Sequence, residues 1–184
     1  TDDEVIAAVA KGCRVEVPWL RPKGLAADDT PMLAVLQHAL TTLEREERYR
    51  PEIVVVLQPT SPLRRAEHID AAVQILLDTG ADSAVSVMEV PHQFRPVSLL
   101  RLETGRLVPV ANGPPVTRRQ EKPPVYARNG PAVLAVRREV LLRHGLYGED
   151  CRPLIMTDQD SVDVDGPRDL AFAEFLLGRK GAIS

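Results

Sequence analysis

The stretch Ile53–Arg64 decides the fold, and it reads IVVVLQPTSPLR. Its opening run, Ile53–Leu57, is uninterrupted, apolar and mostly β-branched. That pattern is typical of a strand covered on both faces, as in a parallel sheet between helix layers. The following segment, Gln58–Arg64, is a proline-rich loop at the carboxyl end of the strand. Ligands in open α/β sheets bind outside the carboxyl ends of strands, so this loop is a candidate ligand site.

Helical periodicity flanks this strand on both sides. The helix before it begins at Thr30-Pro31, and the helix after it ends at Gly80. Alternating strands and helices predict an α/β fold with a mostly parallel sheet. The other predicted elements are helices at 1–11, 137–143 and from 165 onward, and strands at 15–17, 83–87, 132–136 and 161–164, with Leu77, Leu170 and Leu177 among the inward-facing helix positions.

The alternation breaks between Val90 and Pro124. Leu99–Leu102 and Leu107–Val110 flank the turn sequence ETGR, which predicts a β-hairpin. A stretch rich in proline and arginine follows. We interpret the whole of 90–124 as an excursion from the main sheet.

Composition limits the possible functions. The 184 residues are 44% hydrophobic and 27% charged with a formal net charge of −3, which fits one folded domain and excludes a disordered chain. A mildly acidic chain is a poor general nucleic-acid binder, and no apolar run is long enough to span a membrane. Cys13 and Cys151 have no second Cys or His nearby at metal-binding spacing, so we expect neither a zinc site nor a disulfide framework. This cysteine usage indicates a reducing compartment.

An acidic pair lies near the carboxyl end of the chain. If 161–164 is a strand, Asp163 and Asp165 point to the same face with Cα atoms ~6.5 Å apart. Two carboxylates ~5 Å apart repel by roughly 3 kcal/mol at an effective dielectric constant of 20, and a divalent cation between them reverses that sign. The alternative makes Asp165 the cap of the final helix and Asp163 an exposed strand residue. The spacing alone favours this alternative.

Two other regions carry side chains suited to ligands. Gln58 offers a donor and an acceptor to a base or sugar edge, and Ser61 can bind phosphate or cap the next helix. The arginine pair in Arg118-Arg119-Gln120 can hold a carboxylate or phosphate through its planar forks. Each has an ordinary alternative of equal or greater weight in isolation: a strand-to-helix turn for the first, and a solvated basic turn for the second. The loop that carries Arg21 and Thr30 likewise reads as a surface loop followed by a helix cap.

The joint order of these motifs is more specific than any one of them. LQPTSPLR at 57–64, RQ at 119–120, YxxNG at 126–130 and SVDVD at 161–165 closely resemble the acylneuraminate cytidylyltransferase family, the CMP-sialic acid synthetases. TDDE at 1–4, EVPWLRP at 16–22 and LAAD at 25–28 are also similar to that family. The resemblance covers nearly the whole chain.

The resemblance implies a Rossmann-like nucleotidyltransferase fold and an enzyme that moves CMP from CTP to a sialic-acid-like nonulosonic acid. Such an enzyme releases pyrophosphate and requires Mg²⁺. Carried over by position, the residues implied are Asp163 and Asp165 as catalytic metal ligands, Gln58 as a catalytic and nucleotide-binding residue, Arg21 and Thr30 at the nucleotide, and Arg119, Tyr126 and Asn129 at the sugar acid.

The resemblance also implies a homodimer whose contact is made by residues 90–124. We expect a single domain that spans 1–184 and a cytoplasmic location. Members begin with a strand and a Gly-rich loop around the triphosphate, so we expect this domain to be incomplete at its amino end. Two other readings stay open. One is a non-catalytic dimeric module that keeps the fold, and the other is a nucleotidyltransferase that uses another base or sugar.

Overall fold

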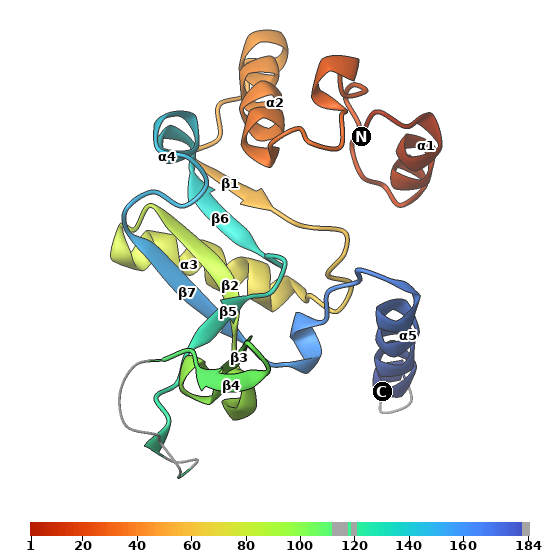
Figure 1. Cartoon of the computed structure of the whole chain (residues 1–184). Helices are drawn as coiled ribbons and strands as arrows, with labels where there is room; N and C mark the ends of the chain where they lie inside the picture. Colours follow the sequence, from red (N-terminus) through yellow and green to blue (C-terminus); the bar gives the residue numbers. More distant parts are fainter. Residues whose placement is uncertain (112–117, 119–120, 182–184) are drawn as a thin grey trace.

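The computed structural model describes residues 1–111, 118 and 121–181, with side chains as far as 178. Its centre is a five-stranded sheet with helices on both faces (Figure 1). The order across the sheet is β1, β6, β2 and β7, and β5 pairs with the carboxyl end of β2 on the same side as β6. The strands are β1 (Ile53–Val56), β2 (Ser83–Glu89), β5 (Tyr126–Arg128), β6 (Leu134–Arg137) and β7 (Cys151–Met156).

The sheet is mixed, which confirms the α/β class but corrects the expectation of a mostly parallel sheet. β7 runs parallel to β2, whereas β6 is antiparallel to both β1 and β2. β1, β2 and β7 therefore point the same way. The chain returns from the excursion at the side of the sheet where β1, β2 and β7 have their carboxyl ends, which we call the carboxyl edge. From there it enters the gap between β1 and β2, so β6 must run in the opposite direction.

Apolar cores lie on both faces of the sheet, as the β1 sequence predicts. Ile53 and Val55 pack with helix α3 (Ala66–Thr79) on one face. Val54 lies on the other face, with α2 (Met32–Glu47) and α4 (Arg138–Arg143). Burial against two layers, rather than parallel pairing, accounts for the unbroken apolar run in β1.

The helices follow the predicted pattern with small shifts at their ends. α3 ends at Gly80, whose φ of 73° gives the left-handed backbone that favours glycine there. α1 (Glu4–Gly12) is capped by Asp3, whose carboxylate accepts hydrogen bonds from the Val5 and Ile6 N–H groups. α5 (Pro167–Gly181) buries Ala173 and Leu176. Three leucines of α3 and α5 that were expected to face inward are instead exposed: Leu77, Leu170 and Leu177.

Three predicted features of the sheet are wrong. Residues 15–17 and 161–164 form no strand, since neither segment lies against a partner strand in the described residues. The last strand of the structure is β7 instead of 161–164. The sequence did not predict β7, because Arg152 and Pro153 interrupt its apolar pattern. Proline is tolerated there because β7 is an edge strand, where one row of N–H groups pairs with no neighbour.

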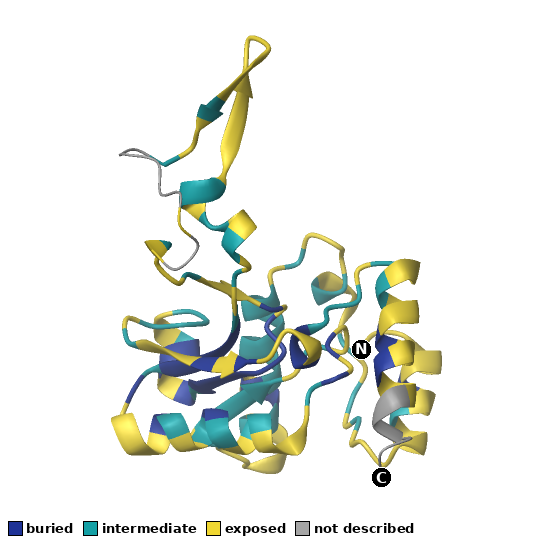
Figure 2. Cartoon of the chain, turned by 90° about the horizontal axis from the view of Figure 1, so that it is seen from below, coloured by how far each residue is buried: buried dark blue, intermediate teal, exposed yellow. Residues whose placement is uncertain are grey.

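The predicted hairpin is present and projects from the sheet. It consists of β3 (Leu100–Glu103) and β4 (Arg106–Pro109), which pair with each other and with no other strand of the described residues. Figure 2 shows it standing away from the body, with most of its residues exposed. Leu102 is 74% exposed and Leu107 is 66% exposed, so the hairpin carries apolar surface into solvent.

Two other properties of the described residues concern the cysteines and the helices. Cys13 and Cys151 are free and exposed. None of the helices that the structure describes combines the length and apolar character needed to cross a bilayer.

Candidate functional site

Three loops meet at the carboxyl edge of the sheet. The first, residues 57–65, follows β1, and the second, residues 157–166, follows β7. The third, residues 129–133, lies between β5 and β6 and reaches the same edge because β6 runs the other way. The Val164 N–H donates to the Thr60 carbonyl at 2.8 Å, which ties the first loop to the second.

The third loop is a bulge in the sheet. β5 pairs Arg128 with Val87, and β6 resumes pairing at Leu134 with Val85. The whole of 129–133 therefore lies opposite Ser86 alone, whose N–H donates to the Val133 carbonyl at 2.8 Å. A bulge of this kind interrupts the ladder and re-aims side chains, and it is common beside active sites.

Arg64 fixes the first loop against the bulge. Its Nη1 donates to the Gln58 carbonyl at 3.0 Å and to the Ala132 carbonyl at 2.7 Å. Partial burial lowers the pKa of the Arg64 guanidinium from its ordinary value. This arginine is therefore a structural brace that holds Gln58 at the edge of the sheet.

The side chain of Asn129 connects β2 with the loop that follows β7. Its side chain is 5% exposed; Oδ1 accepts from the Ser86 hydroxyl at 2.6 Å, and Nδ2 donates to Ser161 Oγ at 2.8 Å. Ser161 in turn donates to the Thr157 carbonyl at 2.6 Å. Asn129 thus links β2 and the bulge to the loop that carries the acidic pair, and these contacts use both ends of its amide.

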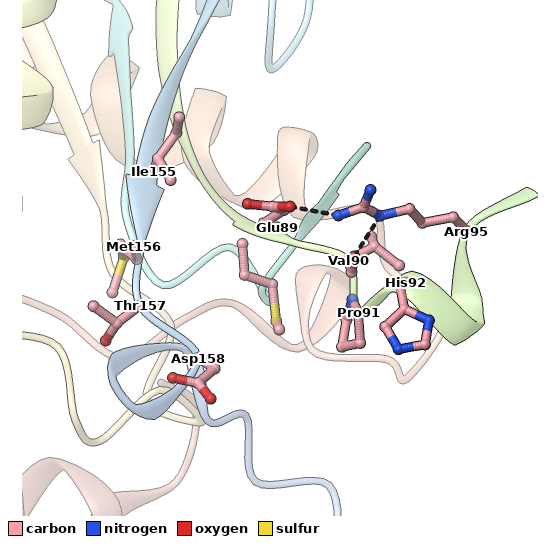
Figure 3. Close-up of a pocket in the computed structure, with 10 residues that line it drawn as sticks. Glu89, Val90, Pro91, His92, Arg95, Ile155, Met156, Thr157 and Asp158 are labelled. Atoms are coloured by element: carbon pink, nitrogen blue, oxygen red, sulfur yellow. Dashed lines mark hydrogen bonds and ion pairs between the residues drawn. The ribbon is translucent and has the colours of Figure 1, made fainter. Parts of the chain in front are cut away.

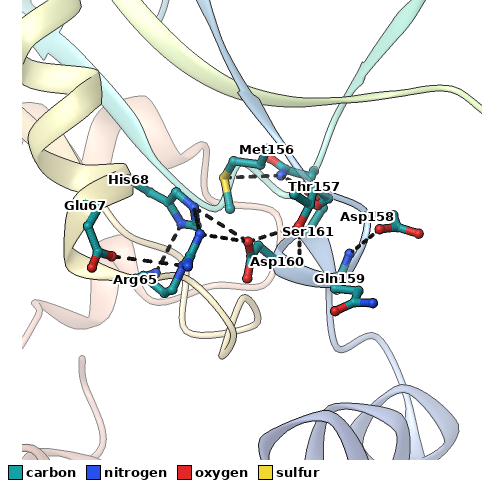
Figure 4. A network of polar contacts seen from close by, with 10 residues as sticks. Arg65, Glu67, His68, Met156, Thr157, Asp158, Gln159, Asp160 and Ser161 are labelled. Atoms are coloured by element: carbon teal, nitrogen blue, oxygen red, sulfur yellow. Dashed lines mark hydrogen bonds and ion pairs between the residues drawn. The ribbon is translucent and has the colours of Figure 1, made fainter. Parts of the chain in front are cut away.

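A charged network lies on the other side of the same loop (Figure 4). Asp160 is buried, and its Oδ2 accepts hydrogen bonds from Arg65 Nη2 at 3.1 Å and from the Thr157 hydroxyl at 2.9 Å. His68 Nε2 lies 3.8 Å from the same oxygen. This network anchors the short 3-10 helix Gln159–Ser161 to the start of α3.

Asp163 enters the site from this anchored loop rather than from a strand. Its Oδ1 is buried and has no hydrogen-bond partner among the described residues. Asp165 is exposed, and its N–H donates to Asp169 Oδ2 at 3.1 Å. Asp169 also accepts from the Gly166 N–H at 3.0 Å, so its carboxylate binds the two backbone N–H groups that come just before α5. The strand argument for a shared face no longer applies to this pair.

The predicted nucleotide residues lie on the β1 side. Gln58 is half-buried, with Nε2 3.6 Å from the Met32 sulfur at the start of α2, so the segment containing Thr30 adjoins this loop. Thr30 does not cap α2, since the cap position is Pro31. Arg21 pairs with Asp2, and this hydrogen bond lowers the pKa of the Asp2 carboxyl. Beside this segment is a cavity of about 550 Å³ that is bordered by Leu57, Pro59, Val17 and Trp19, among others.

The predicted sugar-acid residues lie at the β2 side. Tyr126 is on β5, 48% exposed and paired in register with Glu89. Arg119 lies outside the described residues. A second cavity of about 440 Å³ opens at the carboxyl ends of β2 and β7 (Figure 3). Glu89 and Arg95 form an ion pair in its wall, and Arg95 Nε also donates to the Val90 carbonyl at 3.1 Å.

Several residues of the site were not predicted from the sequence. Ser86 and Ser161 look like ordinary strand and turn serines, and no local pattern marks them. The TDQDS segment at 157–161 did carry a signal, because Thr and Asp side chains often bind their own backbone in tight turns. That signal favours a turn over the strand that the sequence predicted at 161–164.

Comparison with known proteins places the chain among cytidylyltransferases. No family model matches it. It is 31% identical, over 96% of its length and 75% of the relative, to CMP-N,N'-diacetyllegionaminic acid synthase from Legionella pneumophila. It is 26% identical over 168 residues to an N-acylneuraminate cytidylyltransferase of Streptococcus agalactiae, of which it spans 38%.

Solved structures confirm the fold. The CTP complex of CMP:2-keto-3-deoxy-manno-octonic acid synthetase superposes with a TM-score of 0.65 at 15% identity, covering 98% of this chain and 79% of the other. A 4-diphosphocytidyl-2C-methyl-D-erythritol synthase superposes with a TM-score of 0.53 at 13% identity, covering 96% and 78%. The Rossmann-like nucleotidyltransferase fold is therefore confirmed.

Proposed function

This chain belongs to the acylneuraminate cytidylyltransferase family, and from that premise we propose that it transfers CMP from CTP to a sialic-acid-like nonulosonic acid with release of pyrophosphate. The similarity to a known synthase carries the proposal, and the geometry of the loops agrees with it. The chain matches a CMP-nonulosonic acid synthase over 96% of its length, and its polar loops converge at the carboxyl edge of the sheet, where α/β folds bind ligands.

The reaction needs the sugar hydroxyl held in line with the α-phosphorus of CTP. The hydroxyl oxygen attacks the α-phosphorus and forms the new P–O bond, its proton passes to solvent, and the bond to pyrophosphate breaks. Positioning of this kind supplies much of the rate in such transfers. We assign Gln58 to the junction of nucleotide and sugar, because Arg64 holds its backbone at the edge. Arg21 and Thr30 would contact the nucleotide, and Arg119 and Tyr126 the sugar acid.

The acidic loop fits a magnesium ion. Mg²⁺ binds one or two carboxylates together with substrate phosphates, and Asp163 offers a buried carboxylate oxygen that has no partner in the described residues. No cluster of three or more His, Cys, Asp or Glu side chains is arranged for a metal in the described part of the chain. Asp163 and Asp165 would hold the ion, which would neutralise phosphate charge and acidify the attacking hydroxyl.

Asn129 takes a different part in this proposal from the one that the resemblance implied. Its amide is buried and bonded at both ends to serines of the protein. We assign it to holding the acidic loop in place, where it supports the sugar-acid site without touching the substrate.

We also propose that two copies associate through the excursion, because its hairpin exposes leucines on both strands. A cytoplasmic location suits the two exposed free thiols, which persist in reducing compartments.

The test is pyrophosphate release from CTP and Mg²⁺ with three acids: N,N'-diacetyllegionaminic acid, N-acetylneuraminic acid and 2-keto-3-deoxy-manno-octonic acid. We expect release with at least one nonulosonic acid and much less with ATP, GTP or UTP. Release with another nucleotide would favour a nucleotidyltransferase of different specificity. No release with any pair, and no Mg²⁺-dependent heat on CTP titration, would favour a non-catalytic module. Asp163→Asn should abolish release while leaving the melting temperature within a few degrees.

A further inference from the structure

Building on the proposed function, we infer that Ser61 is a positioning residue of the divalent-cation site: its hydroxyl holds a water ligand of the cation that Asp163 binds. Neither the composition of the loop nor the family motif assigns this role to Ser61. The inference rests on two side chains, Ser61 and Asp163, that each carry a buried oxygen without a partner among the described residues and that border the same space.

The Ser61 hydroxyl is the first observation. The residue is 1% exposed, yet its Oγ has no hydrogen-bond partner among the described residues. A buried hydroxyl left unsatisfied costs free energy, so such groups in folded proteins are nearly always paired with protein or bound water. Ser61 does not cap the next helix, because α3 begins at Ala66 with Arg65 as its cap. The alternative that the sequence left open for this serine is therefore excluded.

Gly130 is the second observation. A Cβ placed on it would lie 3.1 Å from Ser61 Oγ and 3.4 Å from Asp163 Oδ2. The hydroxyl and the carboxylate thus converge on a space that any side chain at 130 would fill. The backbone of the two loops is joined next to this point, where the Val164 N–H donates to the Thr60 carbonyl.

The chemistry of this space selects the ligand. A carboxylate and a hydroxyl are both hard oxygen donors, and the third atom that borders this space is the Ala132 backbone nitrogen, whose N–H donates to Asn129 Oδ1 at 3.4 Å and cannot bind a cation. Mg²⁺ prefers oxygen ligands and keeps several of its waters in protein sites. A water on such an ion is polarised and donates strongly, which gives the Ser61 oxygen the partner it lacks. Groups that hold the ligands of a metal in this way typically change affinity by roughly 10–100-fold when removed.

The experiment is a Mn²⁺ titration of the 184-residue chain, followed by the electron paramagnetic resonance signal of free Mn²⁺. Ser61→Ala should weaken Mn²⁺ binding roughly tenfold. Ser61→Cys keeps the side-chain volume but replaces the hydroxyl with a poor hydrogen-bonding group, so it should weaken binding as well. The matched control is Ser83→Ala, since Ser83 is equally buried but its hydroxyl is satisfied by the Tyr147 carbonyl at 2.6 Å.

A second readout separates this role from a structural one. Without metal, Ser61→Ala should melt no lower than the parent, because it removes an unsatisfied polar group. Added Mn²⁺ should then raise its melting temperature less than that of the parent chain. Unchanged Mn²⁺ affinity in both Ser61 variants, or a lowered melting temperature without metal, overturns the inference. If Asp163→Asn loses affinity and both Ser61 variants keep it, Asp163 binds the cation and Ser61 has no part in the cation site. If the parent binds no Mn²⁺, the role of Ser61 is refuted, while pyrophosphate release still tests the proposed function separately.

Discussion

Replacing Asn129 with alanine should destabilise the protein more than a typical single substitution does. The change removes the acceptor of the Ser86 hydroxyl and the donor to Ser161 Oγ. Each such bond contributes roughly 1 kcal/mol, and the cavity left at a 5% exposed position adds a comparable amount. We expect the free energy of unfolding to fall by roughly 3 kcal/mol, a large part of the 5–15 kcal/mol usual for a domain.

Urea unfolding followed by far-ultraviolet circular dichroism measures this loss. The control is Ser83→Ala, which removes one buried hydrogen bond to a carbonyl and should cost about 1 kcal/mol. Catalysis should fall together with stability, because the acidic loop loses its tie to the sheet. Suppose instead that the free energy of unfolding of Asn129→Ala lies within ~0.5 kcal/mol of the parent value while its sugar-acid binding is weaker. Asn129 would then be a substrate contact and would not hold the acidic loop in place.

Three further changes are predicted. Asp82 accepts two backbone N–H bonds ahead of β7, which lower the pKa of its carboxyl, so its contribution to stability is complete at neutral pH and is lost as the pH falls through and below the ordinary carboxyl range. Asp82→Asn should therefore flatten the acid limb of a melting-temperature curve, and an unchanged limb would contradict this. Gly148→Ala should lower the melting temperature by several degrees, because φ is 67° and a Cβ would lie 2.5 Å from the Asp82 side chain, whereas Gly24→Ala meets nothing within 4 Å among the described residues and should be neutral. If the chain forms the proposed dimer, Leu102→Lys with Leu107→Lys should shift its light-scattering mass toward that of a monomer, and an unchanged dimer mass would place the contact elsewhere.

Local sequence signals located most of the helices and the central strands. The apolar run of β1, the glycine stop of α3 and the turn of the β3–β4 hairpin each depend on a few adjacent residues, so periodicity identifies them. Strand direction depends on where the chain returns after the excursion. No residue in β6 encodes that, because the Leu134–Arg137 run would suit a parallel or an antiparallel neighbour equally.

The meeting of two predicted loops could be foreseen from the sequence, but the contacts that hold them could not. The loops carrying Gln58 and Asp163 do lie at one edge and are joined by a backbone bond. The prediction that strand alternation puts Asp163 and Asp165 on one face was wrong, since residues 162–164 have no regular secondary structure. The bonds that hold the turn connect Ser86, Asn129 and Ser161, residues far apart in sequence that only the fold brings together.

The reversed strand β6 has a consequence for biosynthesis. It is the only described neighbour of β1, and roughly 80 residues separate the two paired strands along the chain, a long-range closure of the kind that slows folding. A nascent polypeptide that has emerged only through β2 contains β1 and β2, which run in the same direction. It still lacks β6, the strand that pairs with both of them. Its β-branched edges stay open to other chains until the return segment leaves the ribosome, which makes this interval the one in which a chaperone would have most to protect.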